Sequence, residues 1–172
     1  MNKKEDSFSD VMKRGSFFLL IKPEDNIYSN ISLRNSFFEE LEILIKLGLE
    51  NIEISWSKNK NWLDFVSDIR IKYPIINLGS ASIVSKQSID DSLQIGLNFS
   101  MMKFWDKDLF NYAKSKNYLL IPGIKNLKDL EEAINLNCKI IKIYPIKSKD
   151  SSIDIRNFES VDFIAAGGLS IN

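Results

Sequence analysis

A lysine in a setting suited to covalent chemistry lies in the apolar run over residues 140–144. In an extended strand, alternate side chains share a face. Ile141 and Ile143 would face a layer of helices, which leaves Lys142 and Tyr144 on the inner face of the sheet. A lysine removed from water holds its proton less firmly and becomes a nucleophile toward a ketone. A lysine that snorkels from a strand end into water is the alternative interpretation.

A carboxylate occupies a comparable place in the run over residues 51–55. Ile52 and Ile54 share one face of this strand, and Glu53 and Ser55 share the other. Glu53 is therefore expected to point inward near the C-terminal end of its strand. There it could carry protons for a reaction at an inward lysine. The alternative is a solvated surface charge.

The composition excludes several other kinds of catalysis. The 172 residues include no histidine, so neither a Ser-His-Asp nor a Cys-His arrangement can form. Lysine plus arginine and aspartate plus glutamate both number 23, so charge gives no reason to expect a nucleic acid or a membrane as partner. The single cysteine, Cys138, is interpreted as a structural thiol in a reducing, cytoplasmic compartment.

Strands that alternate with helices would position these residues. Seven short apolar runs recur, after the first, roughly every 22 residues, the spacing of a strand, a helix and two loops. Helical patterns lie between them, such as a helix over 35–47 that ends at Gly48 and a second helix that opens at Ser88. The runs are 17–21, 51–55, 75–78, 97–99, 118–121, 140–144 and 163–166, and one helical stripe consists of Trp62, Phe65, Val66 and Ile69.

This alternation predicts one α/β domain over residues 1–172, with a parallel sheet and an N-terminal helical extension over residues 1–15. The sheet is either a closed barrel or an open doubly wound sheet. No Gly-x-Gly-x-x-Gly pattern follows the first strand, which ends in Ile21-Lys22-Pro23. The missing pattern argues against a dinucleotide-binding domain.

Six short motifs follow one another along the chain. They are Glu53 in Ile-Glu-Ile-Ser, the Gly-Ser-Ala-Ser of 79–82, Phe99-Ser100, Pro122-Gly123, Lys142-Ile143-Tyr144-Pro145 and Ala166-Gly167-Gly168. In this order and spacing they resemble the 2-keto-3-deoxy-6-phosphogluconate and 4-hydroxy-2-oxoglutarate aldolase family. The resemblance runs from about Phe17 to Leu169. It implies a (β/α)8 barrel of the TIM type, with about seven of the eight strands in this chain.

The resemblance also implies a function, that of a class I aldolase, a carbon–carbon lyase that needs no metal or other cofactor. Lys142 would form an imine with a 2-oxo acid or a sugar acid phosphate, and Glu53 would carry protons while pyruvate and an aldehyde form. The family is often trimeric, so a homotrimer is implied as well. The residues implied in substrate binding are Ser82 at the carboxylate, Tyr144 near the methyl group, Gly167 and Gly168 at a phosphate, and Ser100 and Pro122.

The chain departs from the family pattern in two ways. Ser57 stands where the family carries an arginine for the substrate carboxylate, and Lys22 and Lys125 are the cations that could replace it. The sequence also ends soon after the seventh strand, so we expect a barrel without its closing βα unit, whether the chain is clipped or naturally short. Two other functions stay open. One is a sugar-phosphate-binding barrel of another activity, and the other is an impaired family member kept for assembly with a partner.

Overall fold

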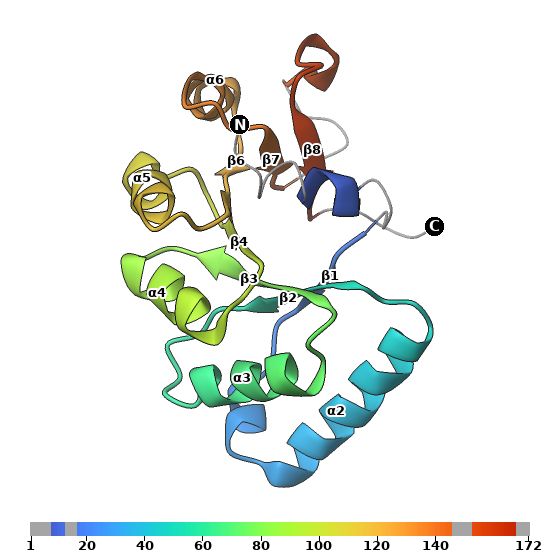
Figure 1. Ribbon diagram of the computed structural model, residues 1–172. Helices are drawn as coiled ribbons and strands as arrows, with labels where there is room; N and C mark the ends of the chain where they lie inside the picture. Colours follow the sequence, from blue (N-terminus) through green and yellow to red (C-terminus); the bar gives the residue numbers. More distant parts are fainter. Residues whose placement is uncertain (1–7, 13–16, 146–152, 168–172) are drawn as a thin grey trace.

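The computed structural model describes residues 8–12, 17–145 and 153–167, and it consists of a curved row of strands with helices outside it (Figure 1). Residues 8–12 are helical. The strands are β1 (Leu19–Ile21), β2 (Asn51–Ser55), β3 (Asn77–Ile83), β4 (Phe99–Met102), β5 (Leu120–Ile121), β6 (Gly123–Ile124), β7 (Ile140–Ile143) and β8 (Asp162–Ala165). The helices are η1 (Asp25–Tyr28), α2 (Ile31–Lys46), α3 (Trp62–Lys72), α4 (Lys86–Ile95), α5 (Lys107–Ser115), α6 (Leu127–Asn135) and η2 (Ile155–Asn157).

Every strand pairing is parallel, and the strands follow one another in chain order. β1 to β5 form one sheet and β6 to β8 form a second. Only Pro122 separates β5 from β6, so one stretch of chain pairs with β4 on one side and with β7 on the other. Proline has no backbone N–H to donate, which suits it to this break. The seven predicted strands therefore all form, and the predicted α/β fold of the TIM-barrel type is confirmed.

Gly123 holds the two sheets close together at this break. A Cβ atom on Gly123 would lie 2.5 Å from the carbonyl oxygen of Met102 and 2.8 Å from that of Lys103. Only a residue without a side chain permits so close an approach between backbones. The end of β4 is therefore pressed against β6, and the residue that follows β4 is fixed near β7.

Apolar clusters lie on both sides of the row of strands. The helix-facing clusters include the predicted stripe of α3, in which Trp62, Phe65, Val66 and Ile69 are at most 1% exposed. The inner cluster consists of Phe8, Phe99, Met101, Leu119, Ile121 and Ile140, with Met12, Phe18 and Ile164 packed against it. The strand interior is thus filled by side chains at the end where the strands begin, as in a packed barrel.

Part of the predicted N-terminal helical extension contributes to this interior. Of residues 1–15 the structure describes 8–12, and Phe8 is only 4% exposed. Its ring centroid lies 4.6 Å from that of Phe99 and 5.6 Å from that of Phe18. The helical segment therefore packs into the barrel core.

Several predicted boundaries are wrong. The helix predicted over 35–47 begins at Ile31, where the Asn30 side chain accepts a hydrogen bond from the Leu33 backbone. The helix that was expected to open at Ser88 opens at Ser85, and Ser88 is the third residue of a capping box. β3 and β4 run further than their apolar runs, because Ser80 and Ser100 are buried within the strands and hydrogen-bond to each other.

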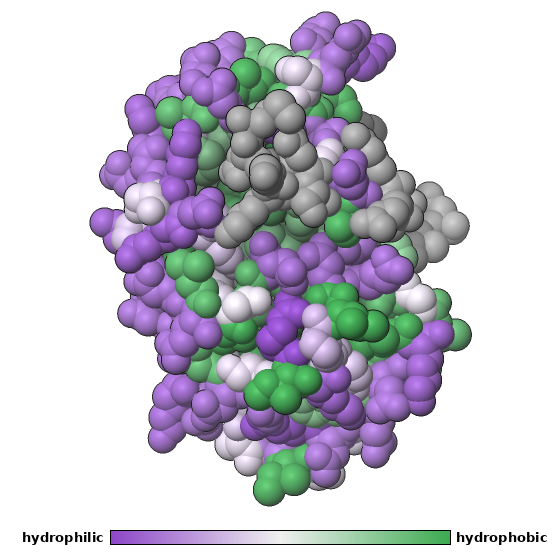
Figure 2. Space-filling view, in the orientation of Figure 1, coloured by the Kyte–Doolittle hydropathy of each residue, from purple (hydrophilic) through white to green (hydrophobic). Residues whose placement is uncertain are grey.

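Apolar side chains on or next to the outermost strand β1 are exposed to solvent. Among the described residues, β1 pairs only with β2 and β8 only with β7. Phe17 and Leu20 are 65% and 55% exposed. On the face seen in Figure 2, apolar side chains lie between larger hydrophilic areas. No helix within the described ranges is long and apolar enough to cross a membrane.

Replacing Gly79 tests the packing of the barrel interior. A Cβ atom on Gly79 would lie 2.4 Å from the Phe99 ring, so Gly79→Ala should lower the free energy of unfolding by about 1–3 kcal/mol. In a Phe99→Leu background the same change should cost far less, because the smaller side chain leaves room for a methyl group. Urea unfolding of the four proteins measures the coupling. Equal costs in both backgrounds would contradict the described contact.

Candidate active site

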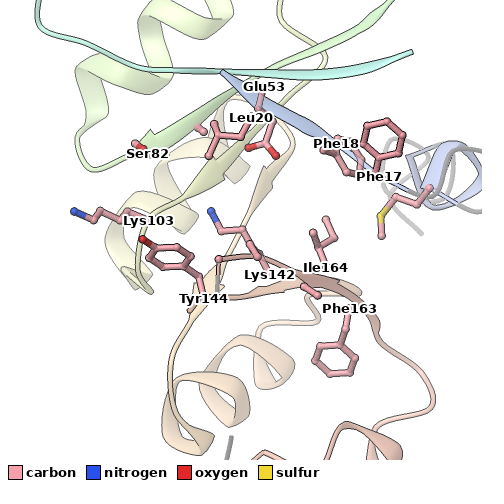
Figure 3. Close-up of a pocket in the computed structure, with 15 residues that line it drawn as sticks. Phe17, Phe18, Leu20, Glu53, Ser82, Lys103, Lys142, Tyr144, Phe163 and Ile164 are labelled. Atoms are coloured by element: carbon pink, nitrogen blue, oxygen red, sulfur yellow. The ribbon is translucent and has the colours of Figure 1, made fainter. Parts of the chain in front are cut away.

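Lys142 and Glu53 lie inside the row of strands and point into one cavity. Lys142 is on β7 and Glu53 is on β2, and they are 8% and 6% exposed. Figure 3 shows the amino group and the carboxylate entering the same space from different strands. Their neighbours Ile141, Ile52 and Ile54 are buried in the helix-facing clusters. Both predictions from alternation are therefore confirmed.

Burial changes the proton affinity of both groups. Burial raises the pKa of Glu53 to about 7, and the nearby Lys142 charge opposes this rise. Burial also lowers the pKa of Lys142, and the Glu53 carboxylate opposes this fall. Both shifts favour the uncharged form. At neutral pH, Lys142 is thus a better nucleophile than a solvated lysine, and Glu53 can both accept and donate a proton.

Ser82 enters the same cavity because β3 is irregular at its C-terminal end. Strand alternation would point Ser80 and Ser82 toward the helices, and Ser80 does hydrogen-bond Ser92 of α4 at 2.7 Å. The register with β4 then shifts between Ser80 and Ile83, and Ser82 has a φ of +62°. This bulge turns Ser82 inward, where its hydroxyl accepts a hydrogen bond of 3.1 Å from Ser55.

Tyr144 and Gly167 form another part of the cavity wall. Gly167 follows β8 with a φ of +71°, and a Cβ atom there would lie 2.7 Å from the Tyr144 ring. A side chain at Gly167 would therefore collide with the ring. The Lys142 amino group lies 6.0 Å from the centroid of the Tyr144 ring. Gly168, the second residue of the implied phosphate site, lies outside the described residues.

Ser100 and Pro122 are placed outside this cavity. Ser100 is fully buried in the middle of β4, where its hydroxyl lies 2.6 Å from that of Ser80 and 2.8 Å from that of Tyr118. The strand was expected to end at Phe99, but it continues to Met102, so Ser100 points to the helix side. Pro122 is buried as well, and its carbonyl oxygen accepts a hydrogen bond of 2.8 Å from the Lys142 backbone. Pro122 therefore supports the lysine through the backbone.

The position of the expected arginine also lies elsewhere. Ser57 and Lys22 line a separate depression with Trp56. Lys125 does not line the cavity of Lys142, and its amino group lies 5.4 Å from the centroid of the Phe104 ring. The position of the expected arginine, Ser57, and the two candidate replacements, Lys22 and Lys125, therefore all lie outside the cavity that contains Lys142 and Glu53.

Lys103 is the cavity residue that the sequence analysis missed. It directly follows β4 and lines the cavity with Glu53, Ser82 and Lys142 (Figure 3). A strand placed over 99–102 would have put Lys103 at the C-terminal end of the barrel strands, where active groups gather. The early end assigned to this strand concealed that signal.

The cavity has a volume of about 560 Å³, and its lining combines a few charged side chains with many apolar ones. Its described lining residues with a carboxylate or an amino side chain are Glu53, Lys103 and Lys142. The remaining wall is largely apolar and comes from both outer strands and the segment before β1. It includes Met12, Phe17, Phe18, Leu20, Phe163, Ile164 and Ala165. Within the described residues, no group of three or more histidine, cysteine, aspartate or glutamate side chains could hold a metal ion.

Comparison with known proteins identifies the type of barrel. A family model described as KDPG and KHG aldolase matches residues 30–172. The KDPG aldolase of Legionella pneumophila, solved with pyruvate captured at low pH as a covalent carbinolamine intermediate, has a TM-score of 0.73 at 16% identity. The match covers 88% of this chain and 71% of that one.

A second solved structure agrees with the first. The 2-keto-3-deoxy-6-phospho-gluconate aldolase of Zymomonas mobilis ATCC 29191 has a TM-score of 0.72 at 17% identity. The match covers 89% of this chain and 71% of that one. At these identities the likeness shows a shared fold. A search of curated proteins finds no match.

The coupling between the two buried groups predicts a pH effect. The Glu53 carboxylate raises the pKa of Lys142, so its removal in Glu53→Gln should lower that pKa further. The reactive amine should then be present at lower pH in the variant. Competitive acetylation of Lys142 between about pH 6 and pH 10, read by mass spectrometry, gives the midpoint.

Lys125 provides the internal control in the same samples, since it lies outside the cavity. Its acetylation profile should be the same in both proteins. A Lys142 midpoint that stays unchanged or rises in Glu53→Gln would show that the two groups are not coupled as described.

Proposed function

Because this chain belongs to the KDPG and KHG aldolase family, we propose that it cleaves a 4-hydroxy-2-oxo acid to pyruvate and an aldehyde through an imine on Lys142. KDPG is 2-keto-3-deoxy-6-phosphogluconate and KHG is 4-hydroxy-2-oxoglutarate. Both are substrates of this chemical class. The observation that carries the proposal is the buried Lys142 amine, whose pKa burial lowers, facing Glu53 across a cavity.

The first step joins the substrate to Lys142. The uncharged amine adds to the C2 carbonyl and gives a carbinolamine, and loss of water then gives an imine. The structure of the Legionella pneumophila relative holds pyruvate as such a carbinolamine. Protonation of the imine nitrogen makes C2 an acceptor for the electron pair of the neighbouring carbon–carbon bond. The low polarity of the cavity supports this step, because burial lowers the pKa of Lys142 and so favours the uncharged amine.

Glu53 provides the proton transfers of the second step. Its carboxylate takes the proton of the C4 hydroxyl, directly or through one water, as the C3–C4 bond breaks and the aldehyde leaves. The bonding electrons move toward the imine nitrogen and produce an enamine. Glu53 then returns the proton to C3, and water releases pyruvate from Lys142. A pKa of about 7 suits a group that must accept and donate the same proton.

The structure also supports a division of the cavity between the two halves of the substrate. Tyr144 lies beside Lys142, where it would contact the methyl carbon of the pyruvyl part. Gly167 lies next to that ring, and the resemblance implies that a phosphate of the aldehyde part binds there. A homotrimer and a cytoplasmic location remain predictions from the resemblance and the composition.

Borohydride reduction in the presence of pyruvate tests the imine. A covalent adduct of one pyruvate should form on Lys142, identified by peptide mass spectrometry, because the reduced imine cannot hydrolyse. Lys142→Arg should form no adduct, while Lys125→Arg should react as the parent chain does. If the folded parent chain forms no adduct, or forms it equally on other lysines, the proposal is wrong.

Glu53→Gln tests the role of the carboxylate separately. The variant should still trap pyruvate on Lys142, because the amine remains buried and loss of the Glu53 charge favours its uncharged form. Exchange of the pyruvate methyl protons with deuterium, followed by NMR, should slow by roughly 100-fold or more, because this exchange needs the acid–base group. Exchange at the parental rate in the variant would assign the proton transfer to another group.

A further inference from the structure

We propose that the Lys103 ammonium group, together with the Ser82 hydroxyl, holds the carboxylate of the 2-oxo acid in place of the arginine expected at Ser57. The inference rests on the proposed function, because it concerns the substrate of the same site. It keeps Ser82 of β3 at the carboxylate and assigns the cation to the end of β4, whereas the family resemblance implies a cation after β2. The anion partner is thus a lysine point charge, and the planar arginine fork is absent.

The cavity needs a cation at this point. A 2-oxo acid carries its carboxylate on the carbon next to the carbonyl, so the negative charge must lie close to the Lys142 amino group. Burial shifts the pKa values of Lys142 and Glu53 toward their uncharged forms, and each charge opposes the shift of the other. Neither group is therefore available as a lasting partner for an anion. Lys103 is the other basic side chain among the described lining residues.

The backbone of Lys103 is fixed from two sides. Its N–H donates a 3.3 Å hydrogen bond to the Ile83 carbonyl of β3. Its own carbonyl lies against Gly123, where a Cβ atom would approach to 2.8 Å. The side chain thus starts from a defined point at the C-terminal end of the barrel and remains exposed at the cavity mouth. Among the described residues, the contact that the structure gives its amino group is the Phe104 ring, at 5.4 Å from the centroid.

Ser82 lies beside Lys103 on the neighbouring strand. Ile83 of β3 pairs with Met102 of β4, so Ser82 and Lys103 flank adjacent positions at the same rim. Figure 3 shows both side chains on one side of the Lys142 amino group, and Phe163 and Ile164 on the other. Ser82 and the Lys103 side chain thus lie on one side, and apolar side chains line the opposite side. The amino group of Lys103 is directed away from Lys142, so the exposed side chain would have to rotate to bring it to a bound carboxylate. The carboxylate of a bound 2-oxo acid fits the polar side.

The proposal predicts a defect that depends on the charge of the ligand. In borohydride trapping, Lys103→Met should raise the half-saturating concentration of pyruvate roughly 10- to 100-fold, the range for loss of a charge-assisted hydrogen bond. Trapping with methyl pyruvate, which offers the same carbonyl without the negative charge, should change by less than about twofold. Lys103→Arg should restore most of the affinity for pyruvate.

Lys125→Met is the matched control. Its amino group also lies 5.4 Å from the centroid of the Phe104 ring, but it does not line the cavity. It removes the same charge near the same ring, so it should leave both ligands nearly unaffected. An equal effect of the two variants on pyruvate would indicate a general field at the cavity mouth and overturn the assigned contact.

The other outcomes separate the two proposals. If the parent chain traps pyruvate on Lys142 but Lys103→Met does so with unchanged affinity, the imine stands and the carboxylate assignment fails. If Lys103→Met weakens pyruvate and methyl pyruvate equally, Lys103 shapes the cavity without binding the charge, and the assignment also fails. If the parent chain traps neither ligand, the imine proposal fails, and the carboxylate assignment fails with it.

Discussion

The candidate active site depends on the electrostatic coupling between a buried amine, Lys142, and a buried carboxylate, Glu53. Lys142 and Glu53 are each less than a tenth exposed, and no direct ion pair between them is formed among the described contacts. Removing a charge from water costs several kcal/mol even after relaxation, so an isolated charge at either position would be strongly disfavoured. Both groups therefore shift toward their neutral forms, and the space between them can admit a substrate carbon.

This pair requires strands that face one another across an enclosed space. β2 and β7 do not pair with each other, yet their inward residues meet because the row of strands curves. The break at Pro122 contributes to that curvature by passing the chain from the sheet of β4 to the sheet of β7. The inner apolar cluster, which includes Phe8 and Phe99, then fills the opposite end of the barrel and leaves the cavity at the C-terminal end.

Strand alternation was sufficient to predict Lys142 and Glu53 because β2 and β7 are short and regular, with isoleucine on every outward position. Alternation did not predict the cavity residues at the C-terminal ends of β3 and β4. Ser82 enters the cavity through a bulge with a positive φ, which a sequence pattern of small residues does not specify. Ser100 was misplaced for a related reason: it is a buried serine that ends the apolar run but not the strand, because its hydroxyl hydrogen-bonds to Ser80 of the neighbouring strand. The same error concealed Lys103, and Phe8 was missed because local patterns do not show long-range packing.

The contrast between regular strands and an irregular rim suggests how this site tolerates its departures from the family pattern. The groups proposed for bond making sit on strand interiors, where a shift by one residue would turn a side chain to the helix layer. The groups proposed for carboxylate recognition, Ser82 and Lys103, sit at strand ends and line the same cavity. In the proposed site, Lys103 after β4 provides the cation, while Ser57 after β2 lines a separate depression. The proposed carboxylate site therefore depends on how strands β3 and β4 end, whereas the positions of Lys142 and Glu53 depend on the regular alternation of β7 and β2.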